Sequence, residues 1–142
     1  MSGIMKIVVR VRVEAAVHPT ESVAKVKAAC LNLFPDLTLT EAPGRLVGEG
    51  ADLEHFRQLV RNQKIRDTAR SVLIRGRQGT TTSFWLNKPA ASVGRLNFGT
   101  SAPLGNLEVT VEDEDLDAWI DHAAESTVGR RLTATRDRTG GR

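Results

Sequence analysis

The sequence predicts an α+β domain in which an antiparallel or mixed β-sheet carries helices mainly on one face. Three observations point to this class: segments in which apolar and polar residues alternate, segments with an apolar residue at every third or fourth position, and the resulting order β-α-β-β-α-α-β-β-α. The chain has 142 residues, of which 40% are hydrophobic, and this suffices for one sizeable core. We therefore expect a single domain over residues 1–126.

The first part of the chain predicts a strand, a helix and a pair of strands. Apolar residues alternate with polar ones over 7–14, which indicates a half-buried strand. We expect Thr20 to cap a helix that ends before Pro35. Two short strands are predicted over 37–41 and 45–50, because these segments flank a Pro-Gly turn signal.

Two helices separated by a break are predicted in the middle of the chain. Apolar residues keep a helical period from Leu53 to Val60, and again from Ile65 to Leu73. At about 100° per residue, the two apolar faces point about 150° apart. One straight helix could not bury both faces against the same sheet, so we expect a break or sharp bend at residues 62–64.

The remaining elements follow from the same two patterns. Alternation predicts strands over 80–87 and 107–112, and a helical period predicts a final helix that Asp115 can cap. Between these strands, residues 88–91 indicate a short turn and residues 94–99 indicate an extended piece or loop. These elements complete the expected domain.

Positive charge is concentrated near the C-terminal end of the chain. The formal net charge is +3, but residues 128–142 carry five arginines against one aspartate. Because this segment holds a net +4, the preceding residues hold a net −1. No apolar period is present in the last residues, so we expect residues 127–142 to form a basic, disordered tail. A nucleic-acid partner must therefore be argued from local clusters of charge rather than from the total.

Several chemical functions receive no support from the sequence. Cys30 is the one cysteine, and no Cys or His pair stands at ligand spacing, so we expect neither an internal disulfide nor a metal site. An acidic run over 112–117 lies where a helix begins, and capping accounts for it better than metal binding does. No nucleophile motif, phosphate-binding loop or long apolar run is present. We expect a cytoplasmic protein that is not an enzyme, needs no cofactor and contacts no membrane.

The densest cluster of basic residues lies over residues 57–77. Asp67 is the only acid in this segment, whose seven basic side chains are Arg57, Arg61, Lys64, Arg66, Arg70, Arg75 and Arg77. Guanidinium groups make bidentate contacts with phosphates, and the amides of Asn62 and Gln63 could read base edges. A solvated helix face, with Asp67 paired to Arg70 or across the break, is the alternative interpretation.

A second candidate surface is the face of the sheet opposite the core. Strand parity assigns Lys6, Arg10 and Arg12 to this face and allows Trp85 and Asn87 to lie beside them. An exposed tryptophan beside arginines can stack unpaired bases. In the alternative, Glu108 and Glu112 pair with the arginines across the strands, or the last helix covers the tryptophan.

A third candidate is the polar segment over residues 87–97. Loops often carry binding residues, and this segment offers Asn87, Lys88, Arg95 and Asn97. Lys88 stands at the end of a strand, where its ammonium could contact a phosphate. Turn chemistry, with Asn87 as the cap of a short helix, is the alternative interpretation.

Five segments of the chain, taken together, resemble an uncharacterised archaeal family that is described as an RNA-binding domain. The segments are His18–Glu21, Asn32–Pro35, Arg61–Arg70, Phe84–Ala91 and Gly94–Phe98. The resemblance implies a fold similar to that of the large-subunit ribosomal protein that contacts 5S ribosomal RNA, an α+β domain with one antiparallel sheet. It implies no reaction. Pro89 departs from the glutamine expected in the family at this position.

From the residues and the resemblance we expect a protein that binds RNA, either structured or ribosomal, through the broken basic helix over 57–77 and the adjacent loops. The expected phosphate contacts are Arg61, Arg66, Arg70, Lys88 and Arg95, and the expected polar contacts are Gln63, Asn87 and Asn97. The alternative is a protein-interaction or homodimerisation module that uses the open sheet face around Trp85.

Overall fold

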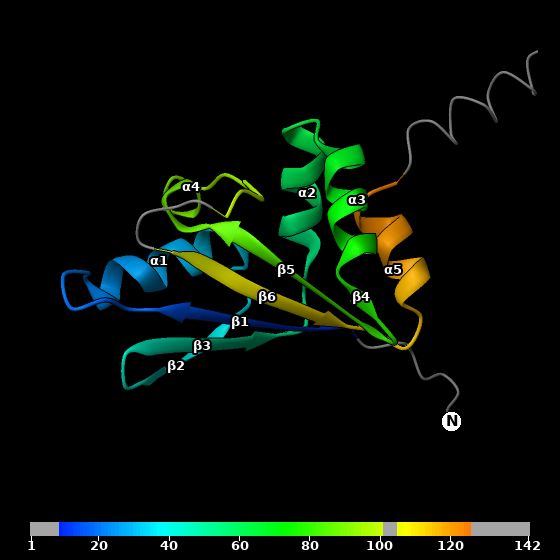
Figure 1. Ribbon diagram of the computed structural model, residues 1–142. Coiled ribbons are helices and arrows are strands. Elements are labelled where there is room, and N and C mark those ends of the chain that lie inside the picture. Colours follow the sequence, from blue (N-terminus) through cyan, green and yellow to red (C-terminus); the bar gives the residue numbers. More distant parts are fainter. Residues whose placement is uncertain (1–8, 101–104, 126–142) are drawn as a thin grey trace, which may run out of the picture.

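The computed structural model describes residues 9–100 and 105–125, which form one six-stranded antiparallel sheet and five helices (Figure 1). The strands are β1 (Arg10–Ala16), β2 (Thr38–Ala42), β3 (Arg45–Gly50), β4 (Arg77–Gln78), β5 (Thr81–Asn87) and β6 (Asn106–Glu112). The helices are α1 (Val23–Leu33), α2 (Glu54–Asn62), α3 (Arg66–Arg75), α4 (Lys88–Ser92) and α5 (Leu116–Ala123). The strand order is β2-β3-β1-β6-β5-β4, and every neighbouring pair is antiparallel. The predicted α+β class is confirmed. Within the described residues, no helix has the length and apolar character that crossing a membrane requires.

Alternation along the strands divides the sheet into a buried face and an open face. In β1, Val11 and Val13 are buried, whereas Arg12 on the other side is exposed. The neighbouring strands β5 and β6 repeat this pattern, and their buried residues are Thr82, Phe84, Leu86, Leu107, Val109 and Val111. The helices lie over the buried face (Figure 1).

Phe56 of α2 links the helices to the sheet. Its ring is fully buried and lies 5.7 Å from the ring of Phe34 and 5.8 Å from the ring of Phe84 in β5. Trp119 of α5 stacks on the same ring at 6.4 Å. Aromatic pairs of this kind contribute about 0.5–1.5 kcal/mol each beyond their buried area. This one side chain of α2 therefore contacts the end of α1, helix α5 and strand β5.

The predicted helix break is confirmed, and it has a defined geometry. Lys64 has a φ of 59°, in the left-handed region that ends many helices. The Ile65 amide donates to the Val60 carbonyl and the Lys64 amide donates to the Arg61 carbonyl, both at 3.1 Å. These two bonds form a Schellman motif, which terminates α2 and turns the chain so that α3 can bury its own apolar face.

The start of α1 differs from the expectation. Ser22, not Thr20, caps the helix, because the Ser22 hydroxyl oxygen accepts the Lys25 amide at 3.3 Å. Residues 18–21 instead form a tight turn, in which the Glu21 amide donates to the His18 carbonyl and the His18 amide donates to the Glu21 carboxylate. Because this turn occupies residues 18–21, α1 begins only at Val23.

Other boundaries shifted by a few residues. β1 continues to Ala16, because its pairing with β3 extends to Ala16 opposite Arg45. Residues 94–99 carry no strand, whereas the short strand β4 was not expected. Asp115 caps α5 as predicted, since its carboxylate accepts the Ala118 amide at 3.1 Å. The predicted tail over 127–142 lies outside the described residues.

Gly76 at the end of α3 allows close packing on β5, and its replacement tests this contact. A Cβ at this position would stand 2.0 Å from the backbone oxygen of Ser83, whose amide donates a hydrogen bond to the Gly76 carbonyl at 3.1 Å. We expect Gly76→Ala to lower the free energy of unfolding by about 3 kcal/mol or more, because backbone must move to admit the methyl group. Urea denaturation measures this loss. The control Gly99→Ala meets only the far end of a flexible side chain and should cost under about 1 kcal/mol; equal losses would contradict the packing argument.

Candidate nucleic-acid interface

The turn between α2 and α3 is held against the loop that follows α4. The Gln63 side-chain amide donates to the Leu96 carbonyl at 3.0 Å, and the Leu96 backbone amide donates to the Gln63 side-chain oxygen at 2.8 Å. Both partners are at least partly buried. The Gln63 side chain thus provides partners for both the N–H and the C=O of Leu96, 33 positions away, and it holds the turn and the loop side by side.

Three cations surround this junction. Arg61, Lys64 and Arg95 are exposed, and their side chains make no hydrogen bond or ion pair within residues 9–100 and 105–125. Residues 61–64 and 95–97 are therefore called the basic corner. Exposed cations without an internal partner are able to bind an anion without first breaking an ion pair.

The arginines of α3 have internal partners instead. Arg70 lies 2.6 Å from Asp121 and also donates to the Ala124 carbonyl, and Arg66 lies 3.6 Å from Glu125. These contacts connect α3 to α5 and to the two residues that follow α5, and Arg77 of β4 pairs with Asp117 of α5. Surface pairs of this kind contribute about 0–1 kcal/mol each. A phosphate could therefore compete for Arg66 and Arg70 at modest cost.

The pair of Arg77 in β4 and Asp117 in α5 changes the pKa values of both partners. The hydrogen bond from Arg77 and its positive charge hold the pKa of the Asp117 carboxyl below its ordinary value. The same contact raises the pKa of Arg77. Both groups thus remain charged at neutral pH, and the acids on α5 reduce the net positive charge along α3.

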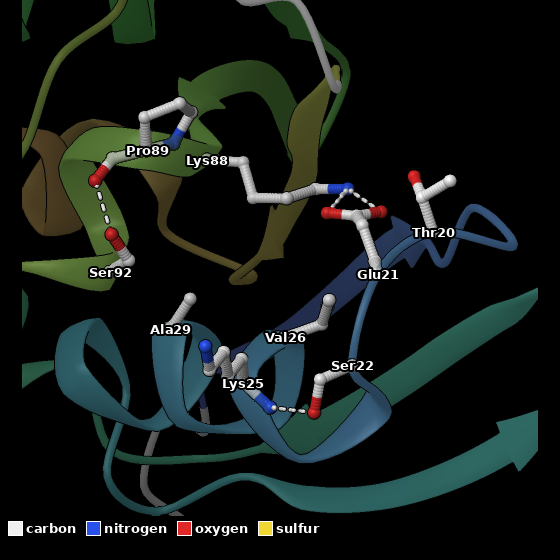
Figure 2. A pocket seen from close by; sticks show the side chains of 9 residues that line it. All are labelled: Thr20, Glu21, Ser22, Lys25, Val26, Ala29, Lys88, Pro89 and Ser92. Atoms are coloured by element: carbon white, nitrogen blue, oxygen red, sulfur yellow. Dashed lines mark hydrogen bonds and ion pairs between the residues drawn. The ribbon is translucent and has the colours of Figure 1, made fainter.

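Lys88 lies inside the fold rather than on the surface (Figure 2). Its ammonium donates to the Ala16 carbonyl at 2.8 Å and to the two carboxylate oxygens of Glu21 at 3.0 and 3.2 Å. Only 6% of the Lys88 side chain and 9% of the Glu21 side chain are exposed. The lysine expected to bind phosphate thus anchors α4 to the segment between β1 and α1.

The two predicted asparagines serve the turns around α4. The Asn87 side-chain oxygen accepts the Ala90 amide at 2.8 Å and caps α4, while its backbone amide donates to the Asn97 carbonyl at 2.7 Å. The Asn97 side-chain oxygen accepts the Gly99 amide at 2.7 Å. The capping interpretation of Asn87 is confirmed, and the exposed Asn97 keeps its side-chain NH₂ at the basic corner.

The open sheet face carries Trp85, which is 46% exposed and is not covered by α5. Across the strands it faces Glu108. Arg12 and Arg45 both bond to Glu14, at 3.0 and 3.1 Å, rather than to the acids of β6. Two arginines of this face are therefore partly neutralised, and a base stacked on the tryptophan would lie near a carboxylate.

Sequence reasoning missed two residues on which these arrangements depend. Leu96 anchors the basic corner through its backbone, and no local pattern indicates which residue a distant glutamine will contact. Glu21 was not among the expected site residues, yet it is the partner of a buried lysine. The sequence offered one general signal for this pair: a buried lysine requires an acceptor, and an acidic residue can supply it.

The fold and the basic corner define an α+β domain with a six-stranded antiparallel sheet and an exposed cationic junction. No family model matches the chain. It is 40% identical over 121 residues to the UPF0201 protein of Pyrococcus horikoshii, covering 78% of this chain and 87% of that relative. It is 37% identical over 123 residues to the UPF0200/UPF0201 protein of Archaeoglobus fulgidus, covering 84% of this chain but only 38% of that relative. The chain belongs to the UPF0201 family of archaeal proteins, which confirms the expected relation to an archaeal family.

Solved structures agree with this assignment. The crystal structure of the UPF0201 protein from Methanococcus jannaschii matches with a TM-score of 0.77 and 36% identity, over 81% of this chain and 98% of that one. A DUF54 protein from Archaeoglobus fulgidus matches with a TM-score of 0.63 at 22% identity, over 86% of this chain and 99% of that one. The second likeness concerns the fold alone.

The buried pair of Glu21 and Lys88 leads to a test of stability. Burial by itself raises the pKa of Glu21, but the His18 amide and the Lys88 ammonium lower it below its ordinary value of 4.5. We expect Glu21→Gln to lower the free energy of unfolding by about 3 kcal/mol, because the lysine loses its counter-charge. Urea denaturation at pH 7 measures the loss. The double variant Glu21→Leu with Lys88→Met should lose less, because no buried charge remains.

The pH dependence follows from the direction of the pKa shift. A carboxyl whose folded pKa is depressed contributes stability that is complete above its ordinary value and is lost as the pH falls through the folded value. The wild-type protein should therefore lose this contribution below pH 4.5, and Glu21→Gln should lack it. Parallel stability curves of the two proteins between neutral pH and pH 3 would contradict this role of Glu21.

Proposed function

We propose that this protein binds RNA by contacting the phosphate backbone with its basic corner. Arg61, Lys64 and Arg95 supply the direct phosphate contacts. Arg66 and Arg70 extend the contact along α3 when phosphates replace Glu125 and Asp121 as their partners. Asn97 offers an exposed amide for polar contacts. Binding of this kind involves no reaction and requires no cofactor.

One observation carries the proposal: the Gln63 amide holds two cationic segments together at a single exposed junction. Separate surface lysines and arginines are common and need no ligand to explain them. Here the cations come from residues about 30 positions apart, and their side chains lack partners within the described part of the chain. Clustered cations of this kind attract a polyanion more strongly than the same charges spread over the surface. In this scheme Gln63, Asn87 and Lys88 position the corner.

The backbone of Lys64 adds independent support. Glycine is the usual residue at the left-handed end of a Schellman motif, because a side chain in this conformation costs about 1 kcal/mol. Strain at a single residue is often retained where that side chain has a function. A cation in this position accords with a role in binding phosphate.

The family resemblance implies a fold similar to that of the ribosomal protein that contacts 5S ribosomal RNA, and this favours structured RNA as the proposed ligand. A backbone-directed corner recognises helical geometry rather than a particular sequence. The open sheet face is the less suitable surface, because Glu108 faces Trp85 and Glu14 occupies two of its arginines.

The alternative function is a protein-interaction or homodimerisation module. It is favoured by the exposure of Trp85, the largest exposed aromatic side chain among the described residues. A concentration-dependent dimer in sedimentation, together with no retained RNA, would favour this alternative.

The salt dependence of RNA affinity tests the proposed contacts. In a log–log plot against salt, the slope should be about −0.7 to −0.9 per phosphate contact. We expect Arg61→Ala with Arg95→Ala to reduce the magnitude of the slope by about 1.4–1.8. The matched control, Arg12→Ala with Arg45→Ala, removes the same charge from the open face and should leave the slope within error. Equal effects of the two double variants would exclude a localised contact.

The same titrations on a chain lacking residues 127–142 separate the domain from the tail. The shortened chain should bind more weakly yet keep the difference between the two double variants. Complete loss of RNA binding would assign the interaction to the tail and remove the basic corner from it.

Lys64→Gly separates binding from stability. Glycine relieves the left-handed strain but carries more entropy in the unfolded chain, so the free energy of unfolding should rise or stay within about 0.5 kcal/mol. RNA affinity should fall several-fold, because one phosphate contact is lost. Thermal or urea denaturation and filter binding measure the two quantities. Unchanged affinity in a stable variant would show that Lys64 does not contact RNA.

A further inference from the structure

A pocket of about 410 Å³ lies between α1 and α4 (Figure 2). Lys25 and Val26 line it from the α1 side, and Pro89 lines it from the α4 side. Its base is formed by the buried pair of Lys88 and Glu21. Sites for small molecules typically have volumes of about 300–1,000 Å³, so this space is large enough for a compact ligand.

The charges that line the pocket favour an anion. Lys88 and Glu21 neutralise each other, whereas the exposed Lys25 has no ion-pair partner within the described residues. Because Glu21 is held in its ionised form, the three groups together carry a net +1 at neutral pH. A monoanion would balance this charge.

The pair at the base is held rigidly. The Lys88 ammonium has three acceptors within 3.2 Å, so each of its three N–H groups has a partner inside the protein. The Glu21 oxygen Oε2 accepts only from Lys88 among the described residues, and it retains capacity for one further donor. Fixed charges in a partly buried site interact with a ligand more strongly than mobile surface charges do.

The remaining surfaces of the pocket are apolar with a few hydroxyl groups. Val26 and Ala29 are buried and form the wall on α1. Ser22 uses its oxygen to accept the Lys25 amide, which leaves its O–H free to donate. Ser92 donates to the Pro89 carbonyl and retains lone pairs. Such a lining suits an apolar body with one or two polar groups.

We propose that this pocket binds a small organic anion in which a phosphate or carboxylate group is joined to an apolar body. The anionic group contacts Lys25 and the Ser22 hydroxyl, and the apolar body lies against Val26, Ala29 and Pro89. None of these residues belongs to the basic corner. The site is thus separate from the proposed RNA interface, and its test does not depend on RNA binding.

The test uses phenyl phosphate and benzoate as probes and follows amide chemical shifts of the full-length protein by NMR. We expect saturable shifts confined to residues 22–29 and 88–92, with at least one probe binding more tightly than inorganic phosphate. The comparison of the two probes distinguishes a phosphate site from a carboxylate site. Phenol, which is neutral at pH 7, should bind more weakly than either anion.

Matched variants assign the binding to the pocket. Lys25→Ala should raise the dissociation constant about tenfold, equivalent to about 1.4 kcal/mol. Lys27→Ala removes the same charge from α1 but lies outside the lining and pairs with Glu41, so it should leave the dissociation constant within about twofold. Ser92→Trp at the exposed rim should block the pocket without changing its charge.

Two results would overturn the proposal. One is the absence of saturable shifts at both segments with either probe at about 10 mM. The other is an equal effect of Lys25→Ala and Lys27→Ala, which would reduce the binding to general attraction by surface charge. Failure of either kind leaves the RNA proposal unaffected, because the basic corner and its readout are different.

Discussion

The arrangement of the basic surface depends on the two hydrogen bonds between the Gln63 side chain and the Leu96 backbone. These bonds hold the turn between α2 and α3, which precedes β5 in the sequence, against the loop after α4, which follows β5. Without the amide, the carbonyl and amide of a buried leucine would lack partners, at a cost of about 1–3 kcal/mol for each unsatisfied group. The bond pair therefore stabilises the fold and brings together the cations on which the proposed function rests.

The basic residues meet three different environments in one small domain. At the corner they are exposed and without partners among the described residues, along α3 they pair with the acids near α5, and Lys88 is buried with Glu21. Basic residues in this domain thus differ in role: some are open to a ligand, some pair with acids on a neighbouring element, and one is buried with its counter-charge. The acidic partner that the fold supplies decides between these roles. This explains why a basic stretch of sequence is weak evidence for binding until the acids opposite it are known.

The sequence predicted the features that arise from local geometry. The change of apolar phase between Val60 and Ile65 indicated the break in the helix, because helical rotation per residue is constant. Strand parity likewise assigned Val11 and Arg12 to opposite faces. The pairing of Arg70 with Asp121 could not be predicted in this way, because 51 residues separate the partners and no period relates them. The burial of Lys88 and the anchoring role of Leu96 arise from the same kind of long-range contact.

The most direct test of the account is ultraviolet cross-linking of the protein to RNA in its own cells, followed by mass spectrometry of the cross-linked peptides. The account predicts cross-links in peptides that contain residues 61–64 and 95–97, recovered with structured RNA. Cross-links found only beyond residue 126, or only around Trp85, would contradict the proposed interface.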